Sequence, residues 1–97
     1  MNIQAMMKQA QKMQKDMLNT KEEINNMNFE GKSSFVTVVV NGNKEVLSVK
    51  IGNEFEFDDI EMLQDMIVIA LNDAMKKVDK EIETKMGKYT QGMPGLF

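Results

Sequence analysis

The spacing of apolar residues near the start of the chain constrains its fold more than any other feature. With Ile3 as the first position of a heptad, the a and d positions are Ile3, Met6, Ala10, Met13, Met17, Thr20, Ile24 and Met27. This 3-4 spacing, with one polar exception, is typical of a helix that packs on another helix along a narrow seam. About 25 residues at about 1.5 Å each would make a rod of roughly 38 Å, which a small sheet is too short to cover.

The next segment predicts three antiparallel strands. Residues 35–40 alternate in a β-branched pattern that is typical of a half-buried strand. Residues 46–51 would return as its partner after a tight turn at residues 41–43, where Asn-Gly-Asn supplies residues that tolerate positive φ. A shorter strand at residues 29–32 would pair on the edge.

A second long helix follows the strands. Asp58 and Glu61 predict a capping box at its start, and Gly87 predicts that it ends at about Met86. The stretch "MIVIALNDAM" in its middle is apolar around most of its circumference, so more than one surface must cover it. A second subunit is the simplest further cover. The predicted dimer interface therefore consists of Met66, Ile67, Ile69, Ala70, Leu71 and Ala74.

These elements predict one α+β domain with the order α-β-β-β-α. A chain of 97 residues makes a single small domain, which we place at residues 1–86. Residues 87–97 contain three Gly and the only Pro, and we expect them to form a flexible tail.

Composition argues against catalysis. The chain has no His, Cys or Trp, so Ser33, Ser34 and Ser48 have no His to activate them, and no disulfide or thiolate site can form. The acidic residues 54–61 lack the spacing of a calcium-binding loop, so we expect no metal and no cofactor. No apolar run approaches the length of a membrane span. We therefore expect no enzyme activity, no small-molecule substrate and no membrane partner.

The charges are segregated along the chain. The formal net charge is −3, yet residues 1–15 carry Lys8, Lys12 and Lys15 and no acid. These lysines take heptad positions f, c and f, away from the seam. They form either a strip that contacts phosphates or the solvated face of a coiled coil. The absence of acids favours phosphate contact, because a solvated helix face usually interleaves both signs.

A second basic zone lies toward the end of the predicted second helix. Acids are interleaved among the lysines at residues 76–83, so there we favour a salt-bridged surface. Lys85 and Lys88 lie beyond the last acid, and we predict that they contact phosphates as well.

Four phrases of the sequence carry a resemblance to a known family. They are "MMKQAQKMQKDM", "VVVNGNKEVLSVKI", "EMLQDMIVIALNDAMKK" and "GMPGLF". Together, over nearly the whole chain, they resemble the YbaB/EbfC family of bacterial nucleoid-associated proteins. The resemblance implies a small cytosolic homodimer that binds double-stranded DNA with relaxed sequence specificity. It also implies a tweezer-like shape, with the sheets and second helices at the joint and the long helices projecting.

Two functional hypotheses follow. The first is a cytoplasmic, nucleoid-associated homodimer that binds double-stranded DNA through its lysines and so affects nucleoid organisation and gene expression. The absence of Arg fits this hypothesis, because bidentate Arg contacts to guanine are the commonest specific base contact. The second is a coiled-coil-type interaction module, in which the long helix binds a partner helix and the lysines only keep it soluble.

Overall fold

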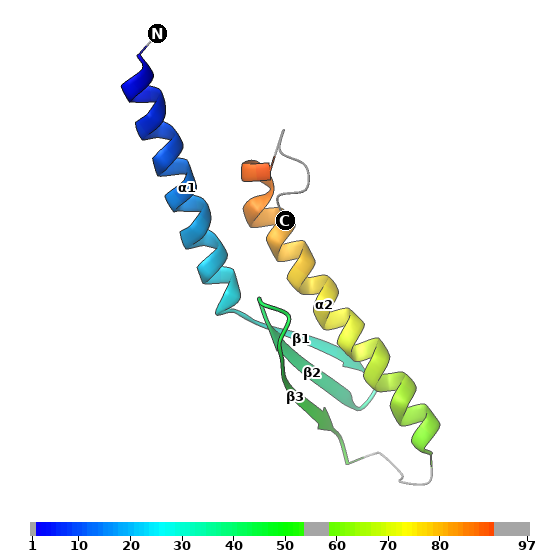
Figure 1. The fold of residues 1–97 in the computed structure, drawn as a ribbon. Coiled ribbons are helices and arrows are strands. Elements are labelled where there is room, and N and C mark those ends of the chain that lie inside the picture. Colours follow the sequence, from blue (N-terminus) through cyan, green and yellow to red (C-terminus); the bar gives the residue numbers. More distant parts are fainter. Residues whose placement is uncertain (1, 54–58, 91–97) are drawn as a thin grey trace.

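The elements of the chain follow the predicted order. The computed structural model describes residues 2–53 and 59–90. One long helix lies across a small sheet, and the other projects from one end of the sheet beside the last part of the first (Figure 1). The elements are α1 (Ile3–Asn25), β1 (Asn28–Ser33), β2 (Val36–Asn41), β3 (Val46–Ile51) and α2 (Ile60–Thr90). The α+β class and the α-β-β-β-α order are confirmed.

Asparagines define both ends of α1. The side chain of Asn2 accepts a hydrogen bond from the Ala5 N–H at 3.2 Å, which caps the first turn. At the other end the Asn26 N–H donates to two carbonyls of the last turn, and the Met27 N–H donates to the Ile24 carbonyl at 3.0 Å. The helix therefore has 23 residues, and the last seam position, Met27, lies beyond it.

The three strands form one antiparallel sheet with the order β1-β2-β3. Ser34 turns the chain between β1 and β2 with a φ of 52°. In the turn after β2, the Asn41 side chain accepts hydrogen bonds from the backbone N–H groups of Asn43 and Glu45. The positive φ of this turn belongs to Lys44, at 64°. The tight turn lies where the sequence predicts it, because the Lys44 N–H donates to the Asn41 carbonyl at 3.0 Å across Gly42 and Asn43. The prediction that residues 41–43 supply the positive φ was wrong, since it falls on the residue that follows them.

Gly42 has another role in the same turn. A Cβ at this position would collide with the Ile24 carbonyl oxygen. The turn therefore packs directly on the end of α1, which fixes where that helix leaves the sheet.

One face of the sheet makes the core. Val36, Val38 and Val40 of β2 are completely buried, while the alternate residues of β2 are only half-buried. Helix α2 packs across β1 and β2 on this face (Figure 1). A Cβ at Gly31 of β1 would collide with the Ala70 carbonyl oxygen and with Ala74, so glycine lets the helix backbone approach the strand closely.

Helix α2 begins and ends later than the sequence predicts. Its start is capped by Asp59, whose Oδ1 accepts from the Met62 N–H at 3.1 Å, whereas Asp58 lies outside the described residues. The helix then runs through Gly87 to Thr90, so the predicted end at Met86 was wrong. Met86 and Tyr89 are buried in the same core cluster as Ile24 of α1. This burial favours continuation of the helix past the glycine, and it makes residues 87–90 of the predicted tail helical.

Side chains of α2 also bind the backbone of β1. Asp73 Oδ2 accepts from the Lys32 N–H at 3.1 Å, and Lys77 Nζ donates to the Glu30 carbonyl at 2.6 Å. Among the described residues, strand β1 has a neighbouring strand on one side only. The two contacts therefore satisfy polar backbone groups that an edge strand would otherwise offer to another chain.

Candidate nucleic-acid interface

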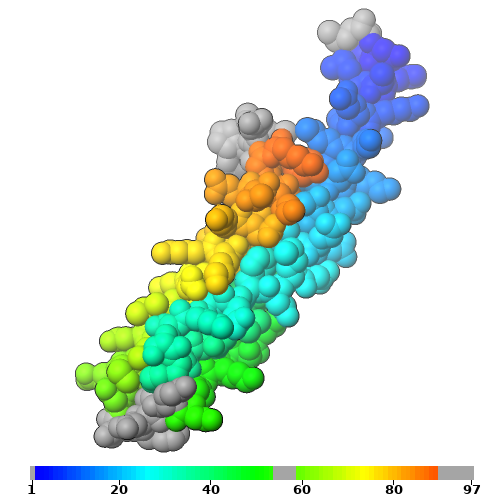
Figure 2. Space-filling model, turned by 180° about the vertical axis from the view of Figure 1, so that it is seen from behind, coloured from blue at the N-terminus to red at the C-terminus, as the bar shows by residue number. Residues whose placement is uncertain are grey.

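The first part of α1 is exposed to solvent. Every residue from 2 to 16 is exposed, and burial begins only at Met17. Figures 1 and 2 show this end of α1 projecting past the end of α2. Residues 2–16 of α1 therefore form a segment that we call the exposed arm. The same helix is anchored in the core by Ile24.

The three predicted lysines of α1 all lie on this arm. At 100° per residue, Lys8, Lys12 and Lys15 fall within an arc of about 60° on the helix surface. The buried Ile24 marks the opposite side. None of the three lysines has a carboxylate within 4.0 Å among the described residues, whereas Lys32, Lys44 and Lys77 do. Their charges are therefore not neutralised by nearby carboxylates of the described part of the protomer.

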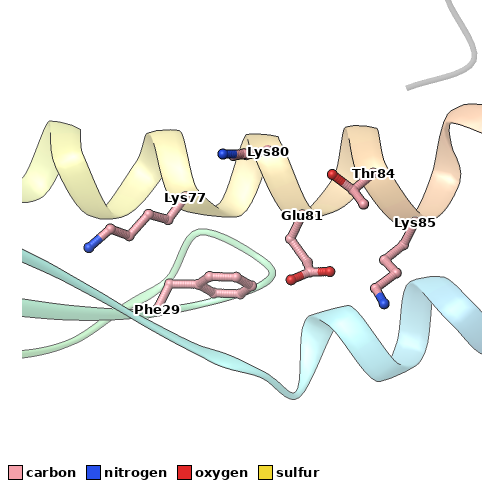
Figure 3. Close-up of a pocket in the computed structure, with 6 residues that line it drawn as sticks. All are labelled: Phe29, Lys77, Lys80, Glu81, Thr84 and Lys85. Carbon is pink, nitrogen blue, oxygen red and sulfur yellow. The ribbon is translucent and has the colours of Figure 1, made fainter.

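Lys85 of α2 lines a cavity of about 430 Å³ together with Phe29 (Figure 3). Lys85 and Glu81 both point toward α1, while Lys80 points away from the cavity. The third lysine of this cavity, Lys77, already donates to a backbone carbonyl. Since Lys77 is held by a carbonyl and Lys80 is turned away, Lys85 is the one lysine of this lining left to meet an anion, which makes this cavity a poor anion site.

Lys88 lies in a different place from Lys85. A cavity of about 380 Å³, which we call the α1–α2 notch, separates the exposed arm from the end of α2 and is lined by Gln9, Lys12, Met13, Asp16, Lys88 and Tyr89. The Lys88 ammonium lies 5.0 Å from the centre of the Tyr89 ring, within the range of a cation–π contact. The notch thus brings together Lys12 and Lys88, which are 76 positions apart in the sequence.

The predicted dimer residues do not share one environment. Ala70 and Ala74 are completely buried inside the protomer beside Gly31, which leaves them no surface for a partner. Ile69 is 56% exposed. The other three predicted residues are half-buried against the core: Met66, Ile67 and Leu71.

Sequence reasoning missed a second apolar surface, on β3. All six residues of this strand are exposed. Val49 pairs with Val38 and Ile51 pairs with Val36, so both continue the face that β2 turns toward α2. The alternation in residues 46–51 indicated that apolar side chains of this strand share one face. The sequence could not show that α2 leaves this part of the face uncovered.

Within the described part of the chain, no helix is both long enough and apolar enough to cross a membrane.

Comparison with curated proteins finds relatives over almost the full length of the chain. A nucleoid-associated protein of Ligilactobacillus salivarius is 44% identical over 99 residues, which cover 99% of this chain and 95% of the relative. One from Exiguobacterium sibiricum is 48% identical, with coverage of 99% and 95%. One from Lactococcus lactis subsp. cremoris is 46% identical, with coverage of 97% and 98%.

Comparison with solved structures supports the fold. The crystal structure of an uncharacterised protein from Helicobacter pylori matches with a TM-score of 0.76 and 23% identity, and the match covers 92% of this chain and 97% of that one. The family model described as the YbaB/EbfC DNA-binding family matches residues 1–93. With the relatives above, this match confirms the resemblance carried by the four sequence phrases, and the chain belongs to the YbaB/EbfC DNA-binding family.

Proposed function

We propose that this protein binds double-stranded DNA as a homodimer, through lysine contacts to phosphates and with little dependence on base sequence. The observation that carries the proposal is the exposed arm, where Lys8, Lys12 and Lys15 share one side without a carboxylate within ion-pair distance in the described part. Long-range attraction to phosphates supplies most of the affinity in binding of this kind.

The residue types support low specificity. Lys is a mobile point charge, whereas the planar fork of Arg is what reads guanine with two hydrogen bonds, and this chain has no Arg. Curated relatives of nearly equal length are named nucleoid-associated proteins. We infer that this protein likewise acts on the bacterial nucleoid, in the cytoplasm.

The uncovered face of β3 supports the homodimer. Four apolar residues close together on this strand are 44–52% exposed, and a contiguous exposed apolar patch is typical of an interaction surface: Val46, Leu47, Val49 and Ile51. On the other edge of the sheet, Asp73 and Lys77 occupy backbone groups of β1. A second copy that packs at β3 and at the exposed Ile69 of α2 would cover this surface and give the molecule two arms.

One observation favours the interaction-module alternative. Ile3, Met6, Met7 and Met13 on the exposed arm are 46–69% exposed, and they include the a and d positions of the seam. A partner helix could cover them. In that case the lysines would only solvate the arm, and removing them would not affect DNA binding.

Binding to unrelated duplexes of equal length tests the proposal. Fluorescence anisotropy with labelled duplexes of different sequence should give affinities that agree within about 1–3 kcal/mol, the value of one good base contact. Failure to bind any duplex at low salt would reject the proposed function. A thousandfold preference for one sequence would reject the low specificity.

A further inference from the structure

The α1–α2 notch holds two lysines from different helices close to one cavity. Lys88 lies over the ring of Tyr89, a residue that is only 8% exposed and belongs to the core cluster. Lys12 approaches from the exposed arm, and Gln9 adds an amide. Neither lysine is ion-paired with a carboxylate among residues 2–53 and 59–90. Two lysines and a glutamine that line one cavity offer the cations and amide donor that suit the oxygens of a phosphodiester.

Asp16 lines the same notch. Its carboxylate has no lysine within 4.0 Å in the described part of the protein, so no direct ion pair there neutralises it. A phosphate in the notch would therefore meet one like charge as well as two opposite charges. Like charges close to a bound anion lower its affinity without changing which groups hold it.

We propose that the α1–α2 notch seats one phosphodiester group of the nucleic-acid backbone between Lys12 and Lys88, and that Asp16 limits how tightly the group is held. This rests on the DNA binding proposed above and adds two specific points to it. One is that α1 and α2 share a single phosphate. The other is that an acidic residue in the site sets the affinity.

A double-mutant cycle tests the shared phosphate. Lys12→Gln and Lys88→Gln should each weaken duplex binding, because each removes one of two cations on the same group. After the first loss the phosphate is held less firmly, so the double variant should lose less than the product of the single losses. Lys8→Gln combined with Lys88→Gln is the matched control, because Lys8 does not line the notch, and its losses should multiply.

Asp16→Asn tests the limiting residue. It should tighten duplex binding several-fold, because it removes the like charge from the notch. Glu22→Gln is the matched control: it removes the same charge from an exposed position on α1 outside the notch, and it should change affinity less than twofold. Circular dichroism and sedimentation would confirm that each variant is folded and has the wild-type assembly state.

The outcomes separate the notch from the proposed function. A wild type that binds no duplex overturns both. If the wild type binds duplex but the losses in affinity from Lys12→Gln and Lys88→Gln multiply in the double variant, the two lysines do not share a phosphate. Equal effects of Asp16→Asn and Glu22→Gln overturn the role of Asp16. In the last two cases DNA binding through the arm still stands.

Discussion

Asp73 joins the helix to the sheet through a single carboxylate. Its Oδ2 accepts from the Lys32 N–H at 3.1 Å and lies 3.5 Å from Lys77 Nζ. The backbone hydrogen bond holds the pKa of this carboxyl below its ordinary value of 3.8, and Lys77 adds to the effect against partial desolvation. The charged form is therefore the form that the folded state favours.

Asp73→Asn should remove an acid-dependent part of the stability. Because the pKa of Asp73 is lowered in the folded state, its contribution to the free energy of unfolding is present above a pH of about 4. That contribution is lost as pH falls through the pKa of the folded state. In urea unfolding the wild type should exceed the variant in stability at pH 7, and the difference should shrink as pH is lowered below about 4.

Asp65→Asn is the control for this measurement, since its carboxylate makes no hydrogen bond or ion pair that ties α2 to the described strands. A stability gap between wild type and Asp73→Asn that is the same at pH 3 and pH 7 would contradict the assigned role.

At the scale of the elements, the contact of α2 with β1 depends on a single glycine. Gly31→Ala should destabilise the fold by about 1–3 kcal/mol, because the added Cβ would overlap the α2 backbone at Ala70. Gly87→Ala is a matched change, since no atom of the described residues lies within 4 Å of a Cβ built there and the residue is helical. It should be neutral or stabilise by up to about 1 kcal/mol.

Urea or thermal unfolding of the two glycine variants decides the point. Equal stability of both variants would mean that the close approach of α2 to β1 is not needed.

Local patterns predicted the elements well, because each rests on neighbours in the sequence. The β-branched alternation predicted β2, and the heptad spacing predicted α1. The end of α2 was not predictable, since Met86 and Tyr89 are buried in one cluster with Ile24 of α1, which is more than 60 positions away. The backbone contacts of Asp73 and Lys77 are equally long-range, and no local signal marks them.

The candidate site was predictable in part for the same reason. The heptad positions placed the three arm lysines on one exposed side, as the helix geometry has them. Lys12 and Lys88 line the same notch because of how α1 and α2 are placed relative to each other. That placement depends on long-range burial in the core, which the sequence does not show. Apolar spacing also placed Ala70 and Ala74 in the predicted dimer interface. Spacing alone does not show whether an apolar helix face packs on a strand of the same chain or on a second copy.

At the scale of the whole molecule, we predict a dimer. Equilibrium sedimentation at low micromolar concentration should give twice the chain mass of 11.1 kDa. Val49→Glu and Ile69→Glu should shift it toward monomer without unfolding, because both side chains are about half exposed in the protomer.

Ser48→Glu is the control for the dimer, because it places the same charge on β3 at a position that pairs with Val39, on the other face of the sheet. It should leave the dimer intact. A monomeric wild type would contradict the predicted dimer. If Ser48→Glu also dissociates the dimer, the interface does not lie on the face of β3 that carries Val49.

The salt dependence of DNA affinity tests the central claim most directly. If Lys8, Lys12 and Lys15 contact phosphates in both subunits, six contacts contribute about −5 to the slope of log affinity against log salt. Affinity should then fall about a thousandfold between about 50 and 200 mM salt. A variant with all three lysines replaced by Gln keeps a similar helix propensity and an unchanged seam. It should stay folded and dimeric, bind more weakly and show a flatter slope. If the folded variant binds as tightly as the wild type with the same slope, the arm does not bind DNA through these lysines.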